Sequence, residues 1–196
     1  RLYVSTEHAY REHAAKQGIF AKAEINVDNV FRDVFAARGC RLSDEEITYL
    51  GENFRRLSLL YMCLYPDDIA CLDALKKAGK RVYILSNAQR SFTWKELLET
   101  GLVAYFDGIL LSSDEGCMKP DPEFYNICCK RYGLDKTRCI MIGNELKSDM
   151  AGASAAGIDG FFINRSPVFH KRETSLYKYV SEKGSLMEVI RQTGIQ

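Results

Sequence analysis

The sequence predicts an α/β protein, with a doubly wound, Rossmann-like parallel sheet preceded by a small bundle of helices. Short apolar runs without polar alternation, such as residues 139–142, are typical of strands covered on both faces. Segments with helical spacing alternate with these runs, which indicates parallel strands joined by helices. The first 64 residues show only helical segments. We therefore expect a helical domain at residues 1–64 and an α/β core at residues 65–196.

Two helices are expected first in the chain. Residues 5–17 place small and aromatic side chains at helical spacing, with Ser5 or Thr6 as the amino-terminal cap and Gly18 as the terminating residue. A second apolar face predicts a helix over residues 27–38. Neither segment carries an obvious chemical motif, so we interpret both as packing elements.

A third helix is expected to begin at Ser43, because its hydroxyl and the Glu46 carboxylate have the spacing of a reciprocal capping box. Its apolar stripe continues through Leu57 as far as Tyr61, and we expect this stripe to lie in the core. Three such helices joined by short loops describe a small bundle.

The remaining chain alternates strands and helices. Pro66 is expected to open a helix that ends at Gly79. The later helices are expected at residues 91–100, 122–132, 150–156 and 185–192. The strands are expected at residues 82–85, 109–113, 139–142, 160–163 and 178–180, the last of these at an edge.

Polar side chains follow three of the expected strands. The first strand ends in a hydroxyl and an amide, the second is followed by a lysine fixed between turn residues, and the third by a glycine turn with two acids. Ligands in open parallel sheets bind at the carboxyl ends of the strands. A hydroxyl, a cation and an acidic loop at one sheet edge suit phosphoryl transfer. The candidate site residues are Ser86, Asn87, Lys119, Asn144, Glu145 and Asp149.

With these motifs the chain resembles the haloacid dehalogenase-like hydrolases over residues 65–194. The motifs are Leu85-Ser86-Asn87, then Lys119-Pro120-Asp121-Pro122, then Gly143-Asn144-Glu145-Leu146-Lys147-Ser148-Asp149. Most members of this superfamily are magnesium-dependent phosphatases, and a helical bundle forms a cap over their active site. The resemblance implies that residues 1–64 are such a cap domain. It further implies that Ser86 and Asn87 bind the substrate's phosphoryl group, that Lys119 neutralises charge, and that Asn144, Glu145 and Asp149 hold Mg²⁺.

The chain departs from the family pattern in two respects. The family's first motif, an Asp-x-Asp whose leading Asp is the nucleophile, has no counterpart, because the first Asp is Asp28 in a helical segment, and the chain begins at Arg1. We therefore expect that an upstream segment is absent, and that this chain alone neither folds stably as a monomer nor is active. Between the strands ending at Leu85 and Ile142 we expect either a gap or a strand from elsewhere. The second departure is Asn144, which stands where the family usually has an acid, so we expect weaker Mg²⁺ binding.

The predicted function is hydrolysis of a small phosphorylated metabolite through an aspartyl-phosphate. A 2-haloacid dehalogenase, a phosphomutase and a catalytically silent relative that binds a ligand or partner are the alternatives. The sequence indicates neither the substrate nor the oligomeric state.

Composition limits the other classes of function. With 27 basic and 26 acidic residues the formal net charge is +1, and no basic run with interleaved aromatic residues is present, so no nucleic-acid partner is expected. No apolar run reaches membrane-spanning length, so no membrane segment is expected. The seven cysteines include no Cys-x-x-Cys pair and predict reduced thiols in a cytoplasmic protein.

Overall fold

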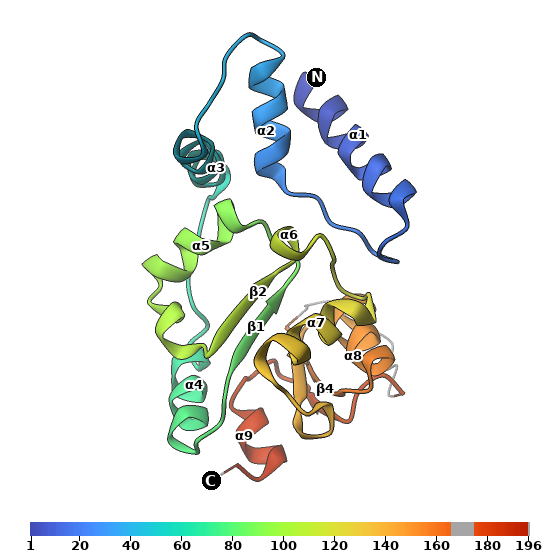
Figure 1. Ribbon diagram of the computed structural model, residues 1–196. Coiled ribbons are helices and arrows are strands. Elements are labelled where there is room, and N and C mark those ends of the chain that lie inside the picture. The colour runs from blue at the N-terminus through green and yellow to red at the C-terminus, as the bar shows by residue number, and fades with distance from the viewer. Residues whose placement is uncertain (166–174, 196) are drawn as a thin grey trace. The chain divides into compact units, whose positions relative to one another are not determined.

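A computed structural model describes residues 1–165 and 175–195 of the chain (Figure 1). The chain divides into two compact units, which are described separately. The helical unit comprises Arg1–Cys63, Ser86–Ala104 and Leu110–Met118. The sheet unit comprises Leu64–Leu85, Tyr105–Ile109 and the described residues from Lys119 onward. The predicted domain division between residues 64 and 65 remains a prediction.

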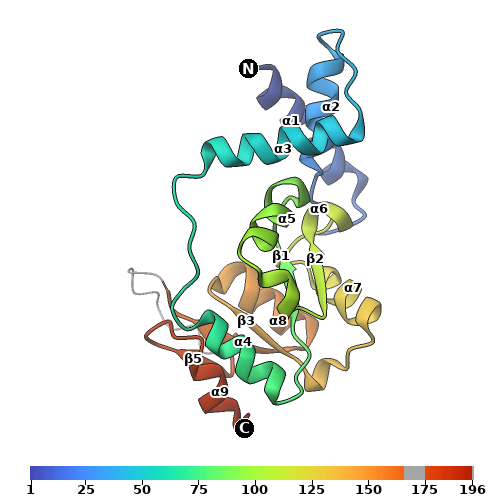
Figure 2. The same ribbon diagram turned by 90° about the vertical axis from the view of Figure 1, so that its left-hand side faces the viewer.

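The helical unit is built from five α-helices and a short 3₁₀ turn. Helix α1 lies beside α2, and α3 contacts both α2 and α5 (Figures 1 and 2). The core of the helical unit contains Val27, Phe31 and Ile47, against which Tyr3 and Phe92 pack. The elements are α1 (Leu2–Gln17), α2 (Val27–Ala36), α3 (Asp44–Ser58), α5 (Arg90–Glu99), η1 (Leu102–Tyr105, ending at the unit boundary) and α6 (Ser112–Glu115).

The amino-terminal caps of two helices were predicted, and the structure confirms one of them. In α3 the Oγ atom of Ser43 accepts a hydrogen bond from the Glu46 amide at 3.2 Å, and the Glu46 carboxylate accepts one from the Ser43 amide at 2.8 Å. The predicted cap at Ser5 or Thr6 is wrong, because α1 already begins at Leu2. Both hydroxyls donate instead to the Leu2 carbonyl at 2.9 Å, as Ser and Thr do inside helices.

The apolar stripe of α3 is buried only in part. Ile47 and Gly51 are buried where α2 and α5 contact the helix. Helix α3 ends at Ser58, and Leu57 and Tyr61 are 82% and 79% exposed. The prediction that the stripe lies in the core as far as Tyr61 is therefore wrong beyond the middle of the helix.

The sheet unit contains a parallel three-stranded sheet in the order β3-β4-β5, in register with Ile142 opposite Phe161 and Phe162 opposite Val180. Helices α7 and α8 pack together through Tyr125, and α4 contacts α9 (Figure 1). The elements are α4 (Asp68–Lys77), α7 (Pro122–Tyr132), η2 (Lys136–Arg138), β3 (Ile140–Gly143), a π-helical turn (Leu146–Met150), α8 (Ala151–Ala156), β4 (Asp159–Ile163), β5 (Tyr179–Ser181) and α9 (Glu188–Thr193).

Strands β1 (Tyr83–Ser86) and β2 (Gly108–Leu111) form a second sheet, and each begins in the sheet unit and ends in the helical unit. Among the described strands no ladder joins β1 to β3, so the strands form two sheets rather than the expected single one. That an upstream strand belongs between them remains a prediction. The prediction that β1 and β3 are covered on both faces is wrong. All of β1 is only partly buried and Ile140 of β3 is 37% exposed, because each strand lies at the edge of its sheet.

The structure also bears on the cysteines and on membrane-spanning segments. None of the seven cysteines, all of which lie in the described part of the chain, forms a disulfide. Within residues 1–165 and 175–195, no helix combines the length and the apolar character that crossing a membrane requires.

Candidate active site

The turn after β3 is closed around the carboxylate of Asp149. Its Oδ2 atom accepts hydrogen bonds from the backbone amides of Asn144 and Glu145, each at 3.0 Å. A Cβ atom added to Gly143 would lie only 2.3 Å from the same oxygen. The turn therefore requires glycine at position 143, and it presents Asn144 and Glu145 at the carboxyl end of a parallel strand, as the sequence predicted.

Asp149 is carried by a π-helical turn, in which the Met150 amide donates to the Glu145 carbonyl at 3.2 Å. Tyr125 of α7 fixes this turn from the other side. Its hydroxyl lies 2.9 Å from the Asp149 carbonyl and 3.2 Å from the Ser148 carbonyl. Burial raises the pKa of Tyr125, and the negative charge of Asp149 raises it further, so the hydroxyl stays protonated and acts as a donor.

Lys119 and Asp149 form a buried ion pair. The Nζ atom of Lys119 lies 2.8 Å from Oδ1 of Asp149, and their side chains are 9% and 7% exposed. The same ammonium donates to the Leu85 carbonyl of β1 at 2.8 Å. Moving two charges out of water costs several kcal/mol per ion, so such a pair persists only where further hydrogen bonds hold both partners, as they do here.

The residues after Lys119 form a well-anchored helix start. Asp121 is 5% exposed, and its carboxylate accepts a hydrogen bond from the Glu123 amide at 3.0 Å, while Pro122 opens α7. This cap fixes the chain just beyond the lysine and, through α7, also sets the position of Tyr125.

The acidic loop offers hard oxygen ligands. Asn144 and Glu145 are exposed, and Glu145 accepts a hydrogen bond from the Ser148 hydroxyl at 2.7 Å. Within the described residues, no three His, Cys, Asp or Glu side chains are arranged to hold a metal ion on their own. Mg²⁺ is usually bound by one or two carboxylates together with water and substrate phosphate, which the exposed Glu145 carboxylate and Asn144 amide suit. Asp149 can add only the lone pair of Oδ1 that Lys119 does not use, because its Oδ2 atom accepts two backbone hydrogen bonds.

Ser86 and Asn87 lie at the end of β1 and belong to the helical unit. Ser86 is partly buried and Asn87 is exposed. The structure thus brings Lys119, Asn144, Glu145 and Asp149 together in the sheet unit. The participation of Ser86 and Asn87 in the same site remains a prediction.

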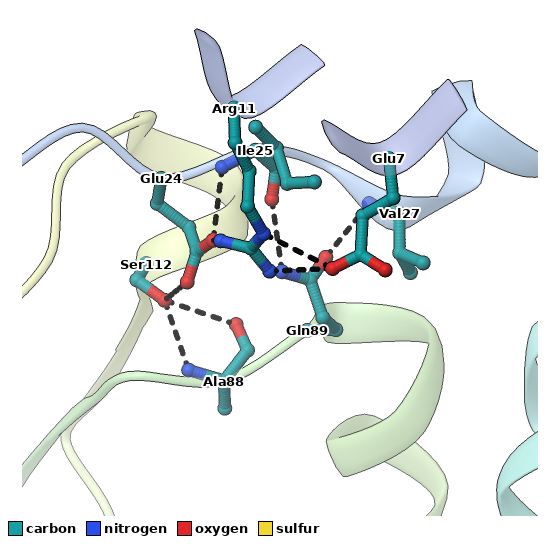
Figure 3. A network of polar contacts seen from close by, with 8 residues as sticks. All are labelled: Glu7, Arg11, Glu24, Ile25, Val27, Ala88, Gln89 and Ser112. Carbon is teal, nitrogen blue, oxygen red and sulfur yellow. Dashed lines mark hydrogen bonds and ion pairs between the residues drawn. The ribbon is translucent and has the colours of Figure 1, made fainter. Parts of the chain in front are cut away.

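The loop that follows Ser86 and Asn87 is held by a polar network that the sequence analysis did not identify (Figure 3). Ser112, the first residue of α6, accepts a hydrogen bond from the Ala88 amide at 2.9 Å, and the Glu24 carboxylate accepts one from Ser112 at 3.1 Å. The only local signal was the serine directly after an apolar strand. Nothing in the sequence around Glu24 indicates that it reaches this loop.

A family model described as haloacid dehalogenase-like hydrolase matches residues 4–157. Among curated proteins, the phosphoserine phosphatase of Thermus thermophilus is 28% identical over 138 residues, which are 70% of this chain and 54% of the relative. The glyceraldehyde 3-phosphate phosphatase of Methanothermobacter thermautotrophicus is 29% identical over 100 residues, which are 51% of this chain and 44% of the relative. The chain thus spans about half the length of these relatives.

The fold is also similar to that of solved structures. A HAD phosphatase from Thermococcus onnurineus superposes with a TM-score of 0.62 at 24% identity, covering 83% of this chain and 70% of that protein. A dehalogenase superposes with a TM-score of 0.64 at 24% identity, covering 97% and 81%. A putative HAD-hydrolase from Bacillus subtilis bound to magnesium gives a TM-score of 0.65 at 21% identity, covering 98% and 81%. At these identities the similarity establishes the fold alone.

Proposed function

Because the chain belongs to the haloacid dehalogenase-like hydrolases, we propose that it serves the magnesium-dependent hydrolysis of a phosphate ester of a small metabolite. The observation that carries this proposal is Lys119, a buried ammonium held between the Leu85 carbonyl of β1 and Asp149, which follows the parallel strand β3. The phosphatase names of the distant relatives support a phosphorylated small molecule as the substrate class.

Lys119 supplies positive charge for the phosphoryl group. An ammonium about 4 Å from a phosphoryl oxygen contributes roughly 4 kcal/mol of attraction at an effective dielectric constant near 20. The Asp149 carboxylate at 2.8 Å offsets part of this attraction. In return it fixes the position of Nζ, so the charge is already oriented when substrate arrives and no reorganisation is needed during the reaction.

Ser86 and Asn87 bind the phosphoryl oxygens in this proposal, Ser86 through its hydroxyl and Asn87 through its backbone or amide. Asn144, Glu145 and Asp149 would hold Mg²⁺, which when bound neutralises negative charge on the phosphoryl oxygens. The resemblance implies an aspartyl-phosphate as the intermediate, and we assign no residue of the present sequence to that nucleophile.

A second candidate is dehalogenation of a 2-haloacid, and Asn144 is the observation that favours it. An amide contributes no charge to a metal site, whereas dehalogenation in this superfamily does not require the metal-binding acids. Lys119 would then bind the substrate carboxylate in place of a phosphate.

Parallel assays of the full-length protein separate these functions. Phosphate release from phosphoserine and glyceraldehyde 3-phosphate is measured with Mg²⁺ and with a chelator, beside halide release from 2-chloropropionate. We expect Mg²⁺-dependent phosphate release that Lys119→Met reduces by at least about 100-fold, the scale of losing one electrostatic stabiliser of a transition state. Lys178→Met, which removes an exposed lysine from its 2.7 Å pair with Asp159, is the control and should retain activity.

Halide release that is unaffected by the chelator would replace the first proposal by the second. If neither product forms while inorganic phosphate still binds, the protein is a silent ligand-binding relative and the enzymatic proposal is wrong.

A further inference from the structure

Glu24 is a buried carboxylate in the helical unit, outside the residues proposed to act on substrate. Its side chain is 8% exposed. One oxygen accepts a hydrogen bond from the Ile25 amide at 2.9 Å, and the other accepts one from the Ser112 hydroxyl at 3.1 Å (Figure 3). Its cationic neighbour, Arg11, lies at 3.6 Å and is half exposed. Glu24 is therefore held mainly by neutral donors.

The hydroxyl of Ser112 has a defined direction because of this carboxylate. Ser112 is fully buried, and its oxygen accepts a hydrogen bond from the Ala88 amide at 2.9 Å. Its single proton has two acceptors in reach, Glu24 at 3.1 Å and the Ala88 carbonyl at 3.3 Å. A carboxylate can only accept, so Ser112 directs its hydroxyl hydrogen at Glu24 and a lone pair at the Ala88 N–H.

Gln89, the next residue of the same loop, is anchored by its own side chain. Its side-chain oxygen accepts a hydrogen bond from the Val27 amide at 2.9 Å, and its amide nitrogen donates to the Ile25 carbonyl at 2.8 Å (Figure 3). Both ends of one side chain thus bind the backbone that leads into α2. With Ala88 tied to Ser112, two successive residues of the loop are fixed immediately after Asn87.

We propose that Glu24, Ser112 and Gln89 are positioning residues that hold the loop of residues 86–89 in its phosphate-binding conformation. This inference rests on the proposed function, in which Ser86 and Asn87 bind the phosphoryl oxygens. None of the three positioning residues contacts the substrate. They act through the Ala88 and Gln89 backbone, and small displacements of binding groups are enough to weaken a phosphate site.

The test uses inorganic phosphate and amide NMR of the full-length protein. Phosphate is titrated while the Ser86 and Asn87 amide shifts are followed, and hydrogen exchange of the Ala88 amide is measured without phosphate. The variants are Ser112→Ala and Glu24→Gln. The matched control is Ser113→Ala, which deletes the neighbouring hydroxyl, whose oxygen binds the Arg90 amide at 3.0 Å rather than the loop.

We expect Ser112→Ala to weaken phosphate binding about three- to tenfold and to accelerate Ala88 exchange about tenfold, the scale of one lost buried hydrogen bond. Glu24→Gln should act in the same direction, and adding it to Ser112→Ala should change affinity little further, because Glu24 acts through Ser112. Ser113→Ala should leave both readouts within about twofold.

The outcomes separate this inference from the proposed function. Equal phosphate affinity and equal Ala88 exchange in all variants would overturn the positioning role. If the wild-type protein shows no phosphate shifts at Ser86 and Asn87, the proposed function is wrong at these residues, and Ala88 exchange alone decides whether the loop is held as described. A thermal melt of each variant checks that it is folded at the temperature of the titration, so that weaker phosphate binding is not a result of general unfolding.

Discussion

Asp149 in the sheet unit and Glu24 in the helical unit are both carboxylates that hold a loop, but they are stabilised differently. Asp149 contacts the buried ammonium of Lys119 at 2.8 Å and accepts two backbone hydrogen bonds. Glu24 accepts hydrogen bonds from one backbone amide and one hydroxyl, and its cationic neighbour, Arg11, is half exposed and 3.6 Å away. The comparison indicates that the first loop depends on a charge pair and the second on neutral hydrogen bonds.

The largest expected effect is loss of the charge pair. Asp149→Ala would leave Lys119 buried without its counter-ion, and removing one partner of a buried pair costs about 3–5 kcal/mol of unfolding free energy. Lys119→Ala should cost a similar amount, which adds a structural role to the catalytic role predicted from the sequence. Urea denaturation of both variants at pH 7 measures these losses.

The matched control for this prediction is an exposed ion pair in the same unit. Lys178 and Asp159 lie 2.7 Å apart, but their side chains are 55% and 48% exposed. Lys178→Ala should therefore cost less than about 1 kcal/mol. Similar losses of unfolding free energy for Lys178→Ala and Lys119→Ala would show that burial does not make the Lys119–Asp149 pair more important for stability than the exposed pair.

A smaller effect is expected where neutral hydrogen bonds hold the loop. Gln89→Ala removes a donor to the Ile25 carbonyl and an acceptor for the Val27 amide. Each hydrogen bond contributes about 0.5–1.5 kcal/mol net, so we expect a loss of roughly 1–3 kcal/mol in unfolding free energy. The control is Gln17→Ala, which removes an exposed amide that contacts the exposed His13 side chain at 2.8 Å and should cost less than about 0.5 kcal/mol.

Features encoded within a short stretch were predictable from the sequence. The glycine before two acids correctly indicated a tight turn after a strand, and the Ser43 and Glu46 spacing indicated a capping box. The direct contact between Lys119 and Asp149 was not predicted, since each was assigned a separate role toward substrate or metal. Contacts of this kind depend on which strands lie together, which local patterns do not specify.

The network around Gln89 was unpredictable for the same reason. Gln89 binds the backbone of Ile25 across a separation of 64 residues, and no local pattern marks either position. The partial exposure of β1 and β3, which were expected to be covered on both faces, has the same cause. The apolar runs predicted the strands correctly, but their degree of burial depends on neighbours that lie far away in the chain.

The smallest expected effect contrasts the two units through the pH dependence of two aspartates. In the helical unit, burial raises the pKa of Asp28 above its ordinary value of 3.8, and the Ser91 hydroxyl and Arg32 offset this only in part. In the sheet unit, Asp107 accepts hydrogen bonds from Lys76 at 2.9 Å and from the Val82 amide at 2.7 Å, and these partners lower the pKa of Asp107.

The two shifts have opposite consequences for stability. A carboxyl whose pKa is raised on folding stabilises the folded state below its unfolded pKa and loses that contribution as the pH rises through the folded value. A carboxyl whose pKa is lowered stabilises the folded state above the unfolded value and loses that contribution as the pH falls. Relative to wild type, the unfolding free energy of Asp28→Asn should therefore increase as the pH rises above 3.8. That of Asp107→Asn should decrease relative to wild type as the pH rises toward 3.8 and past it.

Urea denaturation of the three proteins between pH 3 and 8, in steps of about half a unit, measures both differences. One pKa unit corresponds to about 1.36 kcal/mol of unfolding free energy. Difference curves of the same sign would contradict the contrast, because they would mean that the burial of Asp28 and the pairing of Asp107 with Lys76 shift the two carboxyl pKa values in the same direction.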